Sequence, residues 1–323
     1  MKIGFFEIKN WEATYLQNKL SNHQLVFEEG TIDKTNLPKD WDFDAISIFT
    51  DSKIDSSVLA CLPNLKLIAT RTTGTDHIDQ EAAKAKNVSI KNVPTYGENT
   101  VAEYTFALLL ALSRKIIVAS ERIKEKGRFS SEGLQGFDLQ GKIMGVVGTG
   151  HIGQHVIRIA NGFEMKVIAT DVYPKTGLEQ QLNFRYVSFE DLLKASDIIT
   201  LHIPYLPTTH HLININNLGL IKRGAVLLNT SRGSIVETEA VVKALSEGIL
   251  SGAALDVLEE ETSLKNERQF ILERELSDTD LRTIIENHVL IGMDNVLITP
   301  HNAFNSKEAL IRILDTTVAN IGS

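Results

Sequence analysis

Short runs of apolar residues alternate along the chain with segments of helical period, and they form two series. In the first third the runs are Ile3–Phe6, Leu25–Phe27, Ala45–Phe49, Leu67–Ala69 and Val88–Ile90. The later runs are Ile143–Val147, Val167–Thr170, Ile198–His202, Ala225–Asn229, Gly252–Asp256 and Val296–Thr299. Consecutive rather than alternate apolar positions are typical of parallel strands covered by helices on both faces. The pattern predicts an α/β protein with two doubly wound parallel-sheet domains and a cleft between them.

The connection between the two series is predicted to be helical. Thr100–Glu103 has the pattern of a capping box, and the residues from Tyr104 to Leu112 are apolar on nearly every side of a helix. A helix without a polar face must be buried. We therefore expect one helix over 100–122 that lies at the domain junction or against the second subunit of a homodimer.

The same pattern gives domain boundaries. The chain is expected to leave the first domain near Asn99 and to return to it after His301, so that residues 1–99 and 302–323 form one domain and residues 100–301 the other. Helices are predicted at Trp11–Leu20 and Ser56–Leu62, and a last helix at Lys307–Ile321 is expected to pack on the N-terminal domain.

Composition narrows the class of protein. The 323 residues suit two domains, and 43% hydrophobic with 23% charged residues is ordinary for globular proteins. A formal net charge of −8 argues against nucleic-acid and membrane partners. The single cysteine, Cys61, allows neither an internal disulfide nor a cysteine-based metal cluster, and the longest apolar stretch, Thr105–Leu112, is too short to span a bilayer. Because a short strand rather than a signal peptide opens the sequence, we expect a cytoplasmic protein. We expect no bound metal.

A glycine-rich motif follows the first strand of the second series. Val146–Gly153 reads V-V-G-T-G-H-I-G, precedes a helix-compatible run, and is followed by a strand that ends at Asp171. This context matches the dinucleotide-binding fingerprint. Gly148 would permit the tight turn, Gly150 the approach of the pyrophosphate, and Gly153 close helix packing, with helix N–H groups facing the phosphates. Asp171 would bind the ribose hydroxyls and repel a 2′-phosphate, which favours NAD over NADP.

Further polar segments follow the later strands, at the edge where an open α/β sheet binds its ligands. They are His202–Pro204, Asn229–Gly233, Asp256 with Glu261, and Thr299–Phe304. Each has an ordinary structural explanation by itself, because Arg232 suits an exposed loop, Glu261 belongs to an acidic run, and His301 could cap a turn. Their shared position beside one nucleotide site favours a functional role.

Five motifs spread over the chain carry a resemblance to a known family. They are Arg71–Asp79, Asn92–Tyr96, the glycine motif, Asn229–Gly233 and Thr299–His301. Through them the sequence resembles the D-isomer-specific 2-hydroxyacid dehydrogenases, and within that family the NAD-dependent D-lactate dehydrogenases. The resemblance implies a Rossmann-type NAD-binding domain, a flavodoxin-like catalytic domain, and hydride transfer between NAD and carbon 2 of a small acid. The long charged stretch between Glu261 and His301 resembles an insertion seen among D-lactate dehydrogenases.

The resemblance implies a catalytic trio of Arg232, Glu261 and His301. Arg232 would grip the substrate carboxylate and polarise the carbonyl, and His301 would protonate the developing alkoxide. Glu261 would orient the imidazole and stabilise its charged form. Glu259 and Glu260 are adjacent candidates, and Glu261 is chosen because it follows Asp256 by five positions (261 − 256).

The resemblance also assigns residues to the two ligands. Those expected to contact NAD are Gly148, Thr149, Gly150, His151, Ile152, Gly153, Asp171, Ile203, Pro204, Thr209, Thr230, Ser231, Arg232 and Asp256, the last through the nicotinamide carboxamide. Those expected to contact the substrate are Thr73 and Gly74 through backbone N–H groups, Arg232, and the aromatic residues Tyr96, Phe49 and Phe304.

The three aromatic residues would leave room for a methyl group, which favours pyruvate and D-lactate. Ordinary core packing explains Phe49 and Phe304 equally well, so glyoxylate, hydroxypyruvate, phenylpyruvate and 2-ketoisocaproate remain alternatives. Phosphoglycerate would need more cations, and Arg71 is the only nearby candidate; Val172 and Tyr173 after Asp171 disfavour NADP. A different class of function, a non-catalytic NAD-binding corepressor-like scaffold, could also retain the trio.

Overall fold

The computed structural model describes residues 1–33, 42–261 and 277–322. By its contacts the chain divides into two compact units, Met1–Tyr96 with Asn305–Ser323, and Gly97–Phe304. The sequence pattern predicts divisions after 99 and after 301, whereas the contacts place residues 97–99 and 302–304 in the second unit. Most of the stretch between Glu261 and His301 that resembles an insertion, residues 262–276, lies outside the described residues.

The first unit is built on a parallel sheet of five strands in the order β2-β1-β3-β4-β5. The strands are β1 (Lys2–Phe5), β2 (Gln24–Phe27), β3 (Ala45–Ile48), β4 (Leu67–Thr70) and β5 (Ser89–Lys91). The order is that of flavodoxin-like doubly wound sheets, as predicted for this part of the chain.

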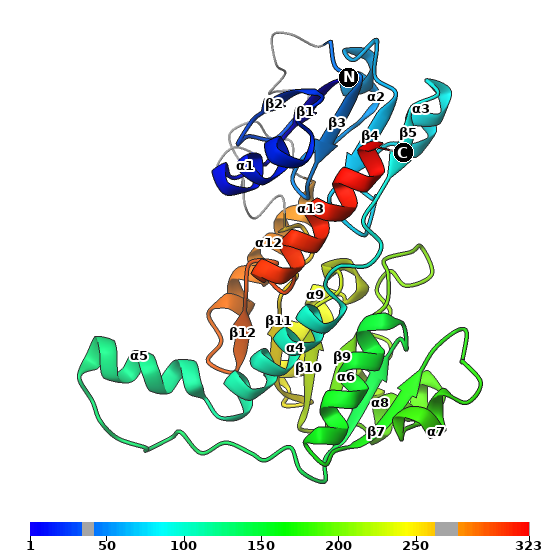
Figure 1. Ribbon diagram of the computed structural model, residues 1–323. Coiled ribbons are helices and arrows are strands. Elements are labelled where there is room, and N and C mark those ends of the chain that lie inside the picture. Colours follow the sequence, from blue (N-terminus) through cyan, green and yellow to red (C-terminus); the bar gives the residue numbers. More distant parts are fainter. Residues whose placement is uncertain (34–41, 262–276, 323) are drawn as a thin grey trace. The chain divides into compact units, whose positions relative to one another are not determined.

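Helices cover both faces of this sheet (Figure 1). One face packs against α1 (Asn10–Lys19) and α13 (Lys307–Gly322), which contribute Leu16 and Leu314 to a shared core. The other face packs against α2 (Ser56–Ala60) and α3 (Gln80–Ala85), through Leu59 and Ala83. The last helix therefore packs on the N-terminal unit, as the sequence predicted.

The second unit contains a parallel sheet of seven described strands in the order β12-β11-β10-β9-β6-β7-β8. The strands are β6 (Ile143–Val147), β7 (Lys166–Thr170), β8 (Arg185–Tyr186), β9 (Ile198–Leu201), β10 (Ala225–Asn229), β11 (Leu250–Leu255) and β12 (Val296–Ile298). The order reverses between β6 and β9, which is the switch point of a Rossmann-type sheet. The pattern missed only β8 among these strands, because it spans two residues.

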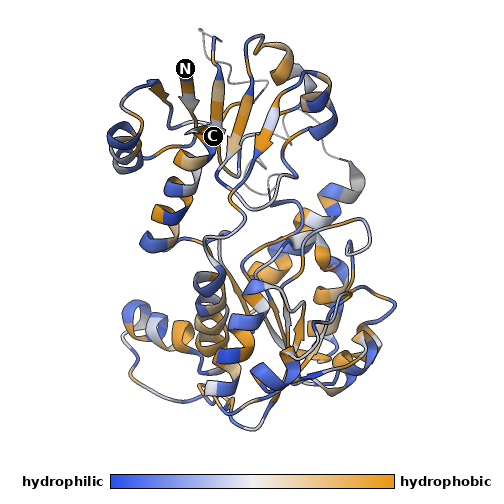
Figure 2. Ribbon diagram, turned by 45° about the vertical axis from the view of Figure 1, so that its right-hand side comes forward, coloured by the Kyte–Doolittle hydropathy of each residue, from blue (hydrophilic) through white to orange (hydrophobic). Residues whose placement is uncertain are grey.

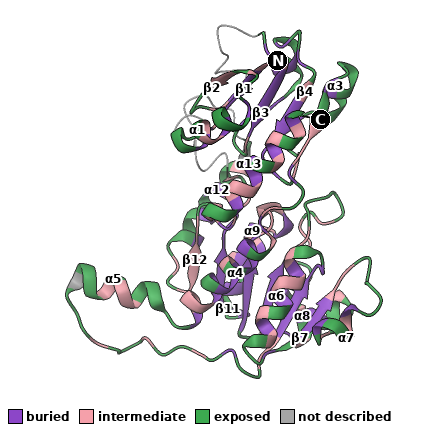
Figure 3. Ribbon diagram, viewed as in Figure 1, coloured by how far each residue is buried: buried purple, intermediate pink, exposed green. Residues whose placement is uncertain are grey.

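Consecutive strand residues of this sheet face opposite cores. Val146 packs with α4 (Glu98–Ser113), α6 (His151–Gly162) and α7 (Leu178–Leu182), while Val147 packs with α8 (Phe189–Ala195), α9 (Thr238–Ser246) and α12 (Asp278–Ile291). Two 3₁₀ turns, η1 (Leu218–Leu220) and η2 (Gly233–Ile235), complete the described elements. Because helices cover both faces, the central strands β6, β9, β10 and β11 are mostly apolar and buried, whereas β8 and β12 at the sheet edges are only partly buried (Figures 2 and 3).

The single helix expected over 100–122 was wrong, because the structure has two. Helix α4 begins at Glu98 with Gly97 at its N-cap, so the capping box predicted at Thr100–Glu103 does not form. The chain turns at Lys115, whose φ of 50° is left-handed, and α5 (Ile116–Lys126) follows. Helix α4 is largely buried, as expected, whereas α5 stands off from the rest of its unit with apolar side chains exposed (Figures 1 and 3).

None of the described helices has both the length and the apolar character needed to cross a bilayer.

Candidate active site

The predicted cofactor and catalytic segments of the second unit all follow the carboxyl ends of its strands. The glycine motif follows β6, Asp171 follows β7, His202 follows β9, Thr230–Arg232 follows β10, Asp256 follows β11 and His301 follows β12. Since the strands are parallel, these segments lie along one edge of the sheet.

The three glycines of the motif occupy three different environments. Gly148 has a φ of +95°, and a Cβ there would lie 2.5 Å from the carbonyl oxygen of His202. A Cβ on Gly153 would lie 2.0 Å from the carbonyl oxygen of Gly148. A Cβ on Gly150 would meet nothing within 4 Å. Gly150 therefore leaves open space at the N-terminus of α6, which is the position that a pyrophosphate requires.

Asp171 is tied to the glycine motif through Thr149. Its Oδ2 accepts hydrogen bonds from the Thr149 N–H at 2.7 Å and the Thr149 hydroxyl at 2.8 Å, and its Oδ1 accepts from the Tyr173 N–H at 2.9 Å. Burial acts to raise the pKa of Asp171, but these hydrogen bonds outweigh it and hold the pKa below its usual value. Asp171 is thus an ionised acceptor beside the glycine motif.

Thr149 itself is fully buried, and its hydroxyl is hydrogen-bonded to Asp171. Its hydroxyl lies 2.8 Å from the hydroxyl of Tyr186, on the short strand β8. Sequence reasoning missed Tyr186 because a strand of two residues has no periodic signal.

The loop after β9 carries Ile203, Pro204 and Thr209. The Thr209 hydroxyl bridges this loop internally, donating to the Pro204 carbonyl at 2.8 Å and accepting from the Leu206 N–H at 2.7 Å. The residue at the start of the loop, His202, has its Nε2 2.8 Å from the Thr200 hydroxyl. Burial lowers the pKa of His202 to about 3, so this ring is neutral and has no acid/base function near neutral pH.

A buried asparagine shapes the loop that presents Arg232. The Asn229 side chain donates to the Arg232 carbonyl at 2.9 Å and accepts from the Ser231 N–H at 3.0 Å. The Thr230 hydroxyl lies 3.0 Å from that of Thr105 on α4. A Cβ on Gly233 would lie 2.0 Å from the Leu258 carbonyl, so only glycine lets this loop touch the segment that leads to Glu261.

Glu261 and His301 are hydrogen-bonded, with 3.0 Å between Oε2 and Nδ1. The other carboxylate oxygen, Oε1, accepts from the Leu258 N–H at 3.0 Å. Both side chains are about a quarter exposed, at 25% for Glu261 and 29% for His301. Because a carboxylate only accepts hydrogen bonds, Nδ1 carries a proton and Nε2 is left to exchange one with a ligand.

The neighbouring Glu259 has different partners. Its Oε1 lies 2.5 Å from His211 Nε2, and its Oε2 accepts from the N–H and hydroxyl of Thr238 at 3.0 and 2.8 Å. The geometry therefore distinguishes Glu261, which is paired with His301, from Glu259, which is hydrogen-bonded to His211 and Thr238 within the same unit. The sequence contained no periodic or motif signal for the His211–Glu259 pair.

Asp256 holds the turn on which His301 lies. Its carboxylate accepts from the Thr299 hydroxyl at 2.5 Å and from the N–H groups of Asn302 and Ala303 at 2.9 and 2.8 Å. The Asp256 carbonyl accepts from the His301 N–H at 2.8 Å, and His301 has a left-handed φ of 51°. Burial raises the pKa of Asp256, partly offset by the hydrogen bonds.

The first unit carries the remaining predicted substrate residues, Thr73, Gly74, Tyr96 and Phe49, whereas Phe304 belongs to the second. Thr73 and Gly74 follow β4, and neither backbone N–H donates to another residue in the described part of the chain. Tyr96, Phe49 and Phe304 are partly buried.

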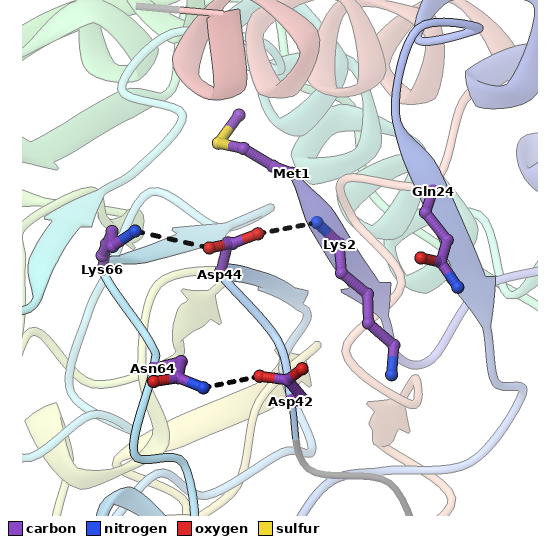
Figure 4. Close-up of a pocket in the computed structure, with 7 residues that line it drawn as sticks. All are labelled: Met1, Lys2, Gln24, Asp42, Asp44, Asn64 and Lys66. Carbon is purple, nitrogen blue, oxygen red and sulfur yellow. Dashed lines mark hydrogen bonds and ion pairs between the residues drawn. The ribbon is translucent and has the colours of Figure 1, made fainter.

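A polar pocket of about 450 Å³ lies elsewhere in the first unit, at the amino ends of its strands (Figure 4). Asp44 accepts from the Lys2 N–H at 2.9 Å and pairs with Lys66 at 3.4 Å, while Asn64 donates to Asp42 at 2.6 Å. These groups satisfy one another, and ligands of open parallel sheets bind at the opposite, carboxyl edge. Among the described residues, no group of three or more His, Cys, Asp or Glu side chains could hold a metal ion.

Comparison with known proteins gives consistent matches. Residues 106–303 match the family model "D-isomer specific 2-hydroxyacid dehydrogenase, NAD binding domain". A 2-hydroxyacid dehydrogenase homolog of Zymomonas mobilis is 37% identical, over 99% of this chain and 96% of that protein. The D-lactate dehydrogenase of Escherichia coli is 33% identical over 100% and 96%, and a glyoxylate reductase of Thermococcus litoralis 35% over 88% and 81%.

A solved structure is also similar to this chain over nearly its whole length. The D-lactate dehydrogenase of Aquifex aeolicus, crystallised with NAD and lactic acid, has a TM-score of 0.86 and 33% sequence identity to this chain, and the alignment covers 99% of this chain and 94% of that one.

Proposed function

The chain belongs to the D-isomer-specific 2-hydroxyacid dehydrogenase family, and we propose that within it the enzyme reduces pyruvate to D-lactate. It is an NAD-dependent oxidoreductase with the two parallel sheets typical of that family. The observation that carries the proposal is the hydrogen bond between Glu261 and His301 at the carboxyl edge of the nucleotide-binding sheet.

His301 is the proposed acid in keto-acid reduction. Bound NADH supplies the hydride that carbon 2 receives. His301 Nε2 gives a proton to the ketone oxygen as negative charge develops there, and takes it back from the hydroxyl in the reverse direction. Glu261 accepts from Nδ1, which fixes the orientation of the ring and leaves Nε2 to face the substrate.

Arg232 is the proposed carboxylate ligand. Its planar guanidinium can bind a carboxylate through two parallel hydrogen bonds and polarise the adjacent ketone. The N–H groups of Thr73 and Gly74 are proposed to bind the same carboxylate, and their lack of acceptors among the described residues supports this.

The cofactor contacts proposed from the motif fit the local structure. Gly150 leaves space for the pyrophosphate at the start of α6, followed by His151 and Ile152, and the ionised Asp171 suits the ribose hydroxyls. Ile203, Pro204, Thr209, Thr230, Ser231 and Asp256 are proposed to complete the contacts. For Thr149 we propose a supporting role through Asp171.

The choice of pyruvate rests on the aromatic residues Phe49, Tyr96 and Phe304, which suit a methyl substituent, and on the D-lactate dehydrogenases among the relatives. Glyoxylate is the main alternative, because a glyoxylate reductase is equally similar. Hydroxypyruvate, phenylpyruvate and 2-ketoisocaproate would each require a larger pocket.

We also propose a homodimer formed through α5. Ile116, Ile117 and Ile123 on this helix are 51%, 43% and 47% exposed, and Phe129 just beyond it is 91% exposed. An apolar patch of this kind is typical of protein–protein interfaces. A cytoplasmic location is proposed from the lone free cysteine, Cys61.

The proposal is tested by a substrate panel with NADH and NADPH, in which NADH consumption and the configuration of the product are both measured. The expected result is the highest kcat/KM with pyruvate and NADH, and D-lactate as product. A higher kcat/KM with glyoxylate would replace the substrate assignment. A protein that binds NADH but reduces none of these acids would favour the scaffold function.

A further inference from the structure

A buried arginine that the proposed mechanism does not use lies at the carboxyl edge of the first unit's sheet. Arg71 directly follows β4 and is 2% exposed. Its Nη2 donates to the carbonyl oxygens of Phe6 at 2.7 Å and Glu7 at 2.8 Å, and its Nη1 donates to the Ser47 hydroxyl at 3.1 Å. The guanidinium also lies over the ring of Phe49, with 5.6 Å between Cζ and the ring centroid.

The carboxylate of Glu7 binds the loop that carries Phe49. Its Oε2 accepts from the N–H groups of Phe49 and Ser52 at 3.0 and 3.1 Å and from the Ser52 hydroxyl at 2.5 Å, and its Oε1 accepts from the Asp51 N–H at 2.8 Å. This single side chain therefore holds the loop 49–52 at four points.

Glu7 connects the two sets of contacts. Its main-chain carbonyl receives Arg71 while its side chain holds the loop, and its backbone has a left-handed φ of 54°. Residues other than glycine rarely adopt this conformation, and it persists where the surrounding contacts over-determine it. Arg71 contacts the Phe49 ring, Glu7 binds the Phe49 N–H, and Arg71 and Glu7 are hydrogen-bonded to each other.

Burying the Arg71 cation costs free energy, because the charge loses its hydration. Burial lowers the pKa of Arg71 to about 10, although Glu12 and Glu7 oppose the shift. An apolar side chain of similar volume would often serve stability as well or better. What the guanidinium adds is a fixed, planar set of donors that locks the directions of its partners.

We propose that Arg71 and Glu7 are positioning residues that set which 2-keto acids the enzyme accepts, by holding the Phe49 ring and its loop in one place. This inference rests on the proposed function, in which Phe49 faces the C3 substituent of the substrate. A fixed ring excludes branched or aromatic substituents, whereas a ring free to move admits them.

The test replaces each support in turn. Glu7→Gln keeps the shape of the side chain but exchanges one acceptor oxygen for an NH₂ group that cannot accept from a backbone N–H. Arg71→Lys keeps the charge but cannot reach three acceptors with one planar fork. For each variant, kcat/KM is measured with pyruvate and with 2-ketoisocaproate, and the dissociation constant of NADH is measured separately.

The expected result is that the ratio of kcat/KM for pyruvate to that for 2-ketoisocaproate falls about tenfold in both variants, while NADH affinity is unchanged. In a Phe49→Leu background, Glu7→Gln should change the ratio no further, because its effect acts through the ring. Amide hydrogen exchange of Phe49, Asp51 and Ser52 should accelerate in Glu7→Gln.

Glu12→Gln is the matched control. Glu12 is a buried carboxylate of the same unit, 7% exposed, that also acts on the charge of Arg71, but it accepts from the Lys9 N–H at 2.8 Å rather than from the 49–52 loop. In Glu12→Gln, the ratio of kcat/KM for pyruvate to that for 2-ketoisocaproate should match the wild type. The amide hydrogen exchange of residues 49–52 should also match it.

The outcomes separate the inference from the function on which it rests. If the wild type reduces 2-keto acids but Glu7→Gln and Arg71→Lys leave the ratio unchanged, the positioning role is wrong and the dehydrogenase assignment stands. An equal change in Glu12→Gln would also overturn it, because the effect would then be general. If the wild type reduces no 2-keto acid, the proposed function fails and the inference fails with it.

Discussion

Two glutamates separated by one residue have different partners, and their partners indicate different roles. Glu261 bonds to His301, while Glu259 bonds to His211 and Thr238. The sequence could not separate them by pattern, because both belong to one acidic run. The resemblance selected Glu261, and the distances supply a physical reason for that choice.

This difference predicts opposite phenotypes. Glu261→Gln should lower kcat about 10- to 100-fold, because an amide can turn its NH₂ group toward Nδ1 and then no longer fixes the orientation and tautomer of the His301 ring, and should leave thermal stability nearly unchanged. Glu259→Gln should lower the melting temperature while kcat is largely retained, because a carboxylate that is 13% exposed and hydrogen-bonded to His211 and Thr238 is lost from the body of the unit. Steady-state kinetics and thermal unfolding of both variants give the comparison, and a larger kcat loss in Glu259→Gln would reverse the assignment.

Asp171 carries a second prediction at this scale. The hydrogen bonds that keep its pKa low leave a negative charge where the adenosine ribose of NADH is proposed to bind. Asp171→Ala should weaken NADH binding about 10- to 100-fold, as expected for loss of charge-assisted hydrogen bonds, and reduce the preference over NADPH. Fluorescence titration with both cofactors measures this, and unchanged discrimination would contradict the proposed ribose contact.

At the scale of elements, the glycine loop after β6 separates stability from ligand binding. Gly153→Ala should destabilise the protein by about 1–3 kcal/mol, since its Cβ would collide with the Gly148 carbonyl. Gly150→Ala meets no protein atom and should leave stability within about 0.5 kcal/mol while impairing NADH binding. Denaturant unfolding and NADH titration of both variants test the pair; equal loss of stability would contradict it.

The loop after β9 predicts a pH effect on stability. The pKa of His202 is about 3 in the folded chain against 6.5 as the ordinary value, so only the unfolded chain binds this proton between those values. Above pH 6.5 the ring is neutral in both the folded and the unfolded chain, so the difference in pKa does not change the free energy of unfolding. As pH falls from 6.5 toward 3, the proton that only the unfolded chain binds lowers the free energy of unfolding. Relative to His202→Gln, wild-type unfolding free energy should fall by about 1.4 kcal/mol per pH unit below pH 6. Parallel pH profiles for the two proteins would contradict the burial of this ring.

Most elements could be predicted from sequence because burial on both faces leaves continuous apolar runs. The exceptions have local causes. Strand β8 is too short for a pattern, and the break between α4 and α5 depends on the left-handed Lys115, while apolar residues continue on both sides of it. Hydrophobic patterns relate residues that are close in sequence. They therefore could not predict the contacts of Arg71 with Phe6 and Glu7, which lie more than 60 positions away.

At the scale of the whole molecule, the exposed apolar face of α5 predicts self-association. Ile117→Glu should convert a dimer to a monomer, because a buried unpaired charge at the interface is costly. Ile285→Glu is the control, since Ile285 on α12 is 62% exposed and lies outside the proposed interface. Light scattering of the three proteins decides; a monomeric wild type, or dissociation by Ile285→Glu alone, would contradict the proposed interface.

The whole account depends on His301 exchanging a proton with the substrate while Glu261 holds its ring. The most direct measurement is the rate of pyruvate reduction by NADH in the wild type and in His301→Gln, with NADH affinity determined on the same preparations. We predict a loss of kcat of about 10²–10⁴-fold with unchanged NADH affinity. Retention of kcat in His301→Gln would contradict the account.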